Sequence, residues 1–251
     1  MKKQIKALLL IFILGVLLIP SSKVKADSIA PSQVGGISFY GQDKSKFIFR
    51  WNYDQNIALS SDQAGNYGYE TVISNLKGKK ITTIDRNTVD NPYATDISIS
   101  TSEYKVSLLV TNAKLRKQAF KIKVRAYTYT DAGEKLYGPY SKEKVIVPRA
   151  TITSKALTSK SSSNVKVKWQ KVSGAKSYTV YVSTKKTSGY KKKGTVKGTS
   201  FVIKNNKRYT DYYVYVVANN IKNGKKKISS TKPSLKYSNI DGYYIRTVYS
   251  Y

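Results

Sequence analysis

The amino-acid sequence predicts an all-β chain that contains two tandem β-sandwiches. The segments VKVKWQ at 165–170 and YYVYVVA at 212–218 alternate apolar and polar side chains, with the period of a strand that buries one face. The first half repeats the pattern, with FIFRW at 47–51 in the place of VKVKW. Asn223-Gly224 lies between two apolar-polar runs, which is a strong signal for a β-hairpin. The 251 residues leave room for two sandwiches of roughly 100 residues each.

The N-terminal segment 1–26 is predicted to be a secretory signal peptide. Three lysines precede the apolar run 7–20, and Val24-Lys25-Ala26 places small residues where a signal peptidase cleaves. The apolar run is short for a bilayer core of about 30 Å, which favours a signal peptide over a membrane anchor. We therefore expect a secreted bacterial protein with no transmembrane anchor after cleavage, which its charge could retain at the cell surface.

The first sandwich is expected to span residues 29–148 and to carry an insertion. Its predicted strands are 47–51, 68–74, 81–84, 104–110, 120–126 and 145–147. The spacing from Trp51 to Ala126 is 126 − 51 = 75 residues, whereas the equivalent spacing from Trp169 to Ala218 is 218 − 169 = 49 residues. The extra residues fall mainly in the polar stretches 52–66 and 85–96. Such insertions usually run over the surface.

The second sandwich is expected to span residues 151–236. The linker Pro148-Arg149-Ala150 is short and should limit freedom between the two modules. The Tyr-rich segment 237–251 is interpreted as a hairpin around Asp241-Gly242 or as an added strand, with a loose tail as the alternative. As an added strand it could pair with a sheet edge of its own or of another molecule, and so mediate self-association.

Three of the predicted strands together resemble a known module. A strand that ends in Trp169, a second strand SYTVYVS at 177–183, and a third with the pattern Tyr-x-Val-x-Val-x-Ala resemble strands B, C and F of a bacterial fibronectin type III module. In secreted bacterial proteins such modules serve as spacers, adhesion units and accessory parts of polysaccharide-degrading enzymes, and the fold alone does not choose between these roles. Phe120 stands where the family often has the tyrosine that anchors the corner before strand F, so the first module should lack that hydrogen bond.

Positive charge is concentrated in the second half of the chain. Without the leader, 45 − 5 = 40 basic residues stand against 14 acidic residues, a formal charge of +26. Residues 27–149 contribute 18 − 12 = +6, and residues 150–251 contribute 22 − 2 = +20, with Asp211 and Asp241 as the acids. An asymmetry of this size points to an acidic partner for the second half.

The composition offers little for catalysis. The chain has no His and no Cys, the residues most used in general acid–base and thiol chemistry, and so it has no disulfide framework either. Asp85, Asp90 and Asp96 could in principle bind Ca²⁺, but their spacing matches no known calcium loop. We therefore expect a protein that is not an enzyme and that has no cofactor and no metal site.

The resemblance to fibronectin type III modules implies that the C–C′ turn and the E–F segment of the second sandwich share one pole, away from the first sandwich. Eight cations would then converge at that pole. They are Lys185, Lys186, Lys191, Lys192 and Lys193 in the turn, and Lys204, Lys207 and Arg208 in the segment. Lysine outnumbers arginine 38 to 7, which favours diffuse attraction to phosphate or sulfate over bidentate recognition of bases. The expected partners are polyanions such as teichoic acid, acidic host glycans or an anionic membrane surface. Sequence-specific recognition of nucleic acid is disfavoured.

Two alternatives to polyanion binding stay open. Tyr181, Tyr213 and Tyr215 lie on the predicted outer face and could stack on sugar rings, as in a carbohydrate-binding accessory protein of a polysaccharide-degrading enzyme. The same tyrosines could instead form cross-strand aromatic pairs, which stabilise a sheet by about 0.2 to 1 kcal/mol per pair without a ligand. The second alternative is a structural spacer, although the surface of a spacer would normally mix both signs of charge.

Overall fold

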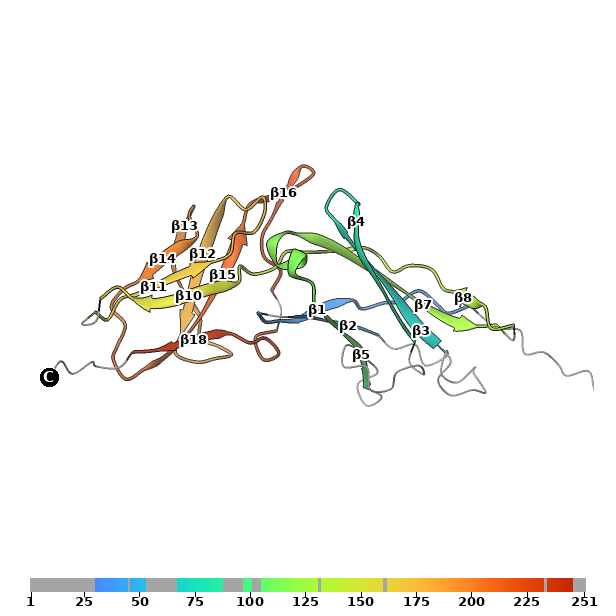
Figure 1. Cartoon of the computed structure of the whole chain (residues 1–251), viewed down its shortest axis with the longest axis horizontal. Coiled ribbons are helices and arrows are strands. Elements are labelled where there is room, and N and C mark those ends of the chain that lie inside the picture. The colour runs from blue at the N-terminus through green and yellow to red at the C-terminus, as the bar shows by residue number, and fades with distance from the viewer. Residues whose placement is uncertain are drawn as a thin grey trace, which may run out of the picture.

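The computed structural model describes residues 30–44, 46–52, 67–87, 97–100, 105–130, 132–159, 162–232 and 234–245. The expected signal peptide and most of the two expected insertion stretches lie outside the described residues. The described strands form two sandwiches that follow one another along the long axis of the molecule (Figure 1).

The first sandwich consists of two antiparallel sheets. The first sheet has the order β1 (Ser38–Gln42), β2 (Phe47–Asn52), β6 (Lys105–Val110) and β5 (Ile97–Ser100). The second sheet has the order β4 (Lys80–Asn87), β3 (Tyr67–Asn75), β7 (Phe120–Tyr129) and β8 (Lys135–Tyr137), with β9 (Lys144–Ile146) also paired to β7. A short 3₁₀ helix, η1 (Ala113–Lys117), precedes β7.

The second sandwich repeats this arrangement. One sheet has the order β10 (Ile152–Leu157), β11 (Val165–Trp169) and β14 (Ser200–Ile203). The other has the order β13 (Lys191–Val196), β12 (Ser177–Ser183), β15 (Asp211–Asn219) and β18 (Asp241–Tyr244). The predicted hairpin is formed by β16 (Ile221–Asn223) and β17 (Lys226–Ile228). The predicted fold class, all-β with two tandem β-sandwiches, is confirmed by this strand pairing.

The alternating apolar residues form the two cores. The inward residues of β2 and β7, from Phe47 to Trp51 and from Phe120 to Ala126, are fully buried. In the second sandwich, Trp169 is 3% exposed and packs against Tyr178, with ring centroids 5.6 Å apart. Each core therefore contains one buried tryptophan, as the repeated pattern predicts.

The corner before strand F differs between the two sandwiches. In the second sandwich, the hydroxyl of Tyr212 accepts a hydrogen bond of 2.7 Å from the backbone N–H of Lys207. In the first sandwich, Phe120 occupies the equivalent position and is fully buried. A phenyl ring has no hydroxyl, so Phe120 cannot make the corner hydrogen bond. The first sandwich lacks that bond, as the sequence predicts.

The C-terminal segment supplies the last strand of the second sandwich. β18 pairs antiparallel with the first half of β15, from Asp211 opposite Tyr244 to Val214 opposite Asp241. Asp241-Gly242 therefore lies within a strand and makes no hairpin turn. Before β18, residues 234–240, which we call the clasp, return to the first sandwich, where the backbone N–H of Ser234 donates to the carbonyl of Tyr40 at 3.1 Å.

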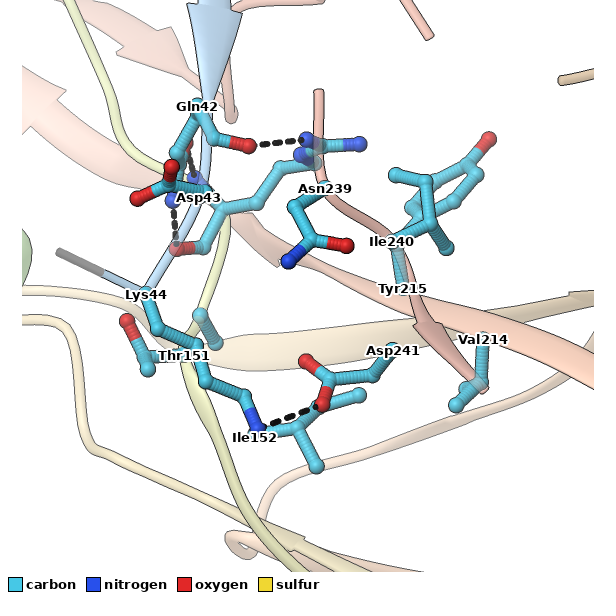
Figure 2. A pocket seen from close by; sticks show the side chains of 12 residues that line it. Gln42, Asp43, Lys44, Thr151, Ile152, Val214, Tyr215, Asn239, Ile240 and Asp241 are labelled. Carbon is cyan, nitrogen blue, oxygen red and sulfur yellow. Dashed lines mark hydrogen bonds and ion pairs between the residues drawn. The ribbon is translucent and has the colours of Figure 1, made fainter. Parts of the chain in front are cut away.

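The linker between the sandwiches is bound on both sides. The side chain of Gln42 accepts a hydrogen bond from the backbone N–H of Arg149 at 3.0 Å and donates one to the Arg149 carbonyl at 2.9 Å. The backbone N–H of Ala150 donates to the carbonyl of Val216 at 3.0 Å. Figure 2 shows Lys44 and Asp241 meeting beside this linker, with Nζ and Oδ1 3.0 Å apart. The linker is thus part of the packed junction between the modules.

Candidate polyanion-binding site

The strand register brings the two lysine-rich loops of the second sandwich to the same end. The antiparallel pairing of β12 with β13 and with β15 places the end of β12 beside the starts of both neighbours. The loops 184–190 and 204–210 therefore leave the sheets at one end. Figure 1 shows β13 and β14 on the side of the second sandwich that lies away from the first. We call this end, residues 184–193 and 204–211, the far pole.

The eight predicted cations all have exposed side chains at the far pole. They are Lys185, Lys186, Lys191, Lys192, Lys193, Lys204, Lys207 and Arg208. Within the described ranges, none of the seven lysine ammonium groups lies within ion-pair distance of a carboxylate. Like charges gathered without counter-charges repel one another, and a bound polyanion would relieve that repulsion.

The structure places part of the cluster differently from the sequence prediction. Lys191, Lys192 and Lys193 were expected in the C–C′ turn, but they form the first half of β13, with Lys192 opposite Tyr181. Because β13 is the edge of its sheet, these lysines also discourage pairing with strands of other molecules. Edge protection therefore explains some of this charge without any ligand, whereas it does not explain the lysines of the two loops.

In the first sandwich, by contrast, several cations are paired with carboxylates or lie over aromatic rings. Arg125 Nε lies 2.8 Å from Glu70 Oε1, and Lys121 Nζ lies 2.9 Å from Glu143 Oε1. The guanidinium of Arg125 also lies 3.6 Å from the ring centroid of Tyr137. These cations are held by carboxylates and aromatic rings, which makes them poor candidates for a polyanion site.

In the second sandwich the two carboxylates do not neutralise the lysine loops. Asp241 lies at the junction, where it pairs with Lys155 at 2.9 Å and with Lys44 of the first sandwich at 3.0 Å. Asp211 is the acid at the far pole, and its side chain is exposed. The net charge of the far pole therefore stays strongly positive.

The tyrosines of the sugar-binding alternative lie on the outer face of the second sandwich, but their rings contact one another. Tyr181 and Tyr215 stack with centroids 5.1 Å apart and ring planes 19° apart. Tyr190 packs on the same Tyr215, with centroids 4.7 Å apart, and the guanidinium of Arg149 lies 5.3 Å from the Tyr215 centroid. Tyr213 is half-buried. This is the cross-strand aromatic pairing expected of a sheet without a ligand.

Two residues of this face have no signal in the sequence pattern. Tyr190 is the last residue of the loop 184–190, and its hydroxyl donates to the carbonyl of Lys186 at 2.7 Å, so it holds the part of that loop that carries Lys185 and Lys186. Arg149 belongs to the expected linker, but it is 6% exposed, and burial lowers the pKa of its guanidinium to about 10. Strand alternation cannot indicate a contact made by a loop or a linker.

The candidates for metal binding gain no support from the described residues. Asp85 is engaged by the first sandwich, accepting a hydrogen bond of 2.6 Å from the Tyr127 hydroxyl and pairing with Lys135 at 2.5 Å. Asp90 and Asp96 lie outside the described residues. Across the described ranges, the structure brings together no group of three or more His, Cys, Asp or Glu that could hold a metal ion. The same ranges contain no helix with the length and apolar character needed to cross a membrane.

No protein-family model matches this chain, and no curated protein matches it. Among solved structures, the chain is similar to the FN1-FN3 domains of chicken CNTN1, with 19% sequence identity and a TM-score of 0.30 over 81% of this chain. The match spans 65% of that structure. At this TM-score the likeness bears on neither fold nor function, and the sandwich fold follows from the strand pairing itself.

Proposed function

We propose that this chain is a secreted, non-enzymatic binding protein that attaches to a polyanionic or glycan-coated surface through the far pole of its second sandwich. The observation that carries the proposal is the convergence of two loops and one edge strand, with eight exposed cations, at one end of the molecule. In this proposal the second sandwich contacts the surface, and the packed junction holds the first sandwich on the side away from that surface.

The chemistry of the far pole favours a ligand with many dispersed negative charges. Seven of the eight cations are lysines, whose compact ammonium groups act as point charges and do not impose the planar geometry of an arginine pair. Phosphate, sulfate and carboxylate groups along a polymer fit this arrangement. Cell-wall polymers such as teichoic acid and acidic host glycans carry such groups, and no base-specific reading of nucleic acid is required.

A role as a structural spacer is the alternative function that one feature of the structure favours, namely the fixed junction between the sandwiches. The clasp and the linker fix the two sandwiches to each other, as a rigid spacer would require. Rigidity alone does not account for a far pole with eight exposed cations, so we place the spacer second. The carbohydrate-binding accessory role comes third, because the rings of Tyr181 and Tyr215 already cover each other.

A binding screen with the full chain tests the proposed function. The screen would present phosphate polymers, sulfated and carboxylated glycans, and neutral glycans of matched length, each at low and at high salt. We expect binding to the charged polymers at low salt and its loss at high salt, since neutralising cations release counterions. Binding to neutral glycans that persists at high salt would support the sugar-binding alternative, and no binding to any probe would support the spacer.

A further inference from the structure

A groove lies at the junction between the two sandwiches, at the opposite end of the second sandwich from the far pole. Its volume is about 460 Å³, within the range of roughly 300 to 1,000 Å³ that is usual for small-ligand sites. Both modules contribute its walls, with the β3–β4 turn and the residues after η1 on one side and the β11–β12 loop and the β16–β17 hairpin on the other. The backbone N–H of Ser173 donates to the carbonyl of Lys117 at 2.6 Å, which joins the two sides.

The floor of the groove is apolar. Ala119 from the first sandwich and Ile221 from the second are 4% and 3% exposed, and both belong to the core of the second sandwich. The partly buried Leu76 packs against the same core. The floor is therefore built from residues of a packed core, and of these three it is Leu76 whose side chain stays partly accessible to a ligand.

The rim of the groove carries positive charge and free amides. The exposed lysines Lys77, Lys176 and Lys222 come from three different segments. The side-chain amides of Gln118 and Asn223 also line the groove and, within the described residues, make no hydrogen bond. The described lining contains no carboxylate. Ammonium groups attract anions, and amides can donate to and accept from hydroxyls.

We propose that this groove is a binding site for a short acidic oligosaccharide, separate from the far pole. Negatively charged groups of the sugar would pair with the three lysines, its hydroxyls would bond to Gln118 and Asn223, and an apolar ring face would lie on Leu76. Because each side of the groove belongs to a different sandwich, the site exists only while the clasp and the linker hold the sandwiches together. The inference goes beyond attachment through the far pole and does not depend on it.

The test uses titration of the full chain with tri-galacturonate, with a neutral trisaccharide as the comparison ligand. The groove variant is K77Q/K176Q/K222Q. The matched control is K166Q/K168Q/K197Q, which removes the same number of charges from β11 and from the turn after β13, outside both the groove and the far pole. All six side chains are exposed, so both variants should keep the wild-type circular dichroism spectrum.

We expect the groove variant to bind tri-galacturonate about tenfold more weakly than the wild type, the loss that one or two charge-assisted contacts would produce. The control variant should keep nearly the wild-type affinity, and the neutral trisaccharide should bind much more weakly than the acidic one. Equal weakening by both variants would overturn the proposal, since it would indicate diffuse attraction only. Equal affinity for the neutral trisaccharide would also overturn it. Because tri-galacturonate is short, the outcome of this titration is independent of whether a long polymer binds the far pole.

Discussion

The ring of Tyr237 in the clasp stacks on the ring of Tyr40 in β1, with centroids 4.1 Å apart and planes 27° apart. The guanidinium of Arg50 lies 3.7 Å from the Tyr40 centroid, so a cation adds to the stack. Beside them, the backbone N–H of Gln42 donates to the hydroxyl of Ser238 at 3.2 Å. A segment that leads into the last strand of the second sandwich is therefore packed on the first strand of the first.

Gly41 allows this close approach, and replacing it tests the clasp. A Cβ at Gly41 would lie 2.2 Å from the backbone oxygen of Tyr237, so Gly41→Ala must displace the clasp. We expect a loss of stability of about 1 to 3 kcal/mol, typical of overpacking, and faster proteolysis within residues 234–240. Gly35→Ala is the matched control, because its Cβ would meet its nearest neighbour at an ordinary 3.7 Å. Equal urea midpoints for the two variants would show that the clasp does not hold the modules.

Each sandwich contains one tryptophan, which allows the two cores to be tested separately. Trp169→Ala should cost about 3 to 5 kcal/mol, because it leaves a large cavity in a packed core. That loss is a large share of the stability of a small domain, so we expect the second sandwich to unfold. The remaining Trp51, fully buried, should keep its native fluorescence until the first sandwich melts. Immediate loss of the Trp51 signal in this variant would mean that the two sandwiches fold only as one unit.

Removal of the C-terminal segment tests its role as the closing strand. Deleting residues 238–251 removes β18 together with Ile240 and Ile245, which are 5% and 1% exposed. Burial of an isoleucine contributes about 1.5 to 3 kcal/mol, so the melting temperature of the second sandwich should fall. The deletion also exposes the edge of β15, which should promote self-association in sedimentation experiments. An unchanged melting temperature would contradict the structural role of β18.

Tyrosine burial predicts a loss of stability in alkaline solution. Burial, with a hydrogen bond to Glu70, raises the pKa of Tyr140 to about 12, and burial raises the pKa of Tyr190 to about 12. An unfolded tyrosine ionises near pH 10. Between about pH 10 and pH 12 the unfolded chain thus binds fewer protons than the folded chain, and stability falls as pH rises. The double variant Tyr140→Phe/Tyr190→Phe should lose less stability over this range than the wild type, as measured by urea unfolding at each pH. Equal losses would show that these two hydroxyls are not protected by the fold.

The sandwiches could be predicted from the sequence because a strand that buries one face has an apolar residue at every second position. Trp51 and Trp169 lie in the cores for that reason. The interpretation of the Tyr-rich C-terminal segment as an added strand is confirmed by the pairing of β18 with β15, whereas the alternative hairpin around Asp241-Gly242 is wrong. The pattern carries no information on which strand a terminal segment will join. The packing of Arg149 and the clasp depends on contacts between modules, which residue periodicity within one strand does not encode.

The far pole was predictable in part. The strand order of the fibronectin type III modules that the sequence resembles predicts that the two lysine-rich loops share one end, and the strand register places them there. The position of Lys191 on an edge strand and the hydrogen bond from Tyr190 to the Lys186 carbonyl depend on where the loop ends and β13 begins. Loop boundaries follow from tertiary contacts, and the run of three lysines favours neither a turn nor a strand strongly.

The salt dependence of polymer binding tests the central claim most directly. The affinity of the full chain for a sulfated or phosphate polymer would be measured over a range of salt concentrations for the wild type, K191Q/K192Q/K193Q and K225Q/K226Q/K227Q. The second variant removes three exposed cations from the β16–β17 hairpin at the opposite end. Each lost contact should reduce the slope of log K against log salt by about 0.7 to 0.9. Attachment through the far pole predicts weaker binding and a slope flatter by up to about 2.7 for the first variant, with a smaller change for the second. Equal changes in the two variants would contradict it.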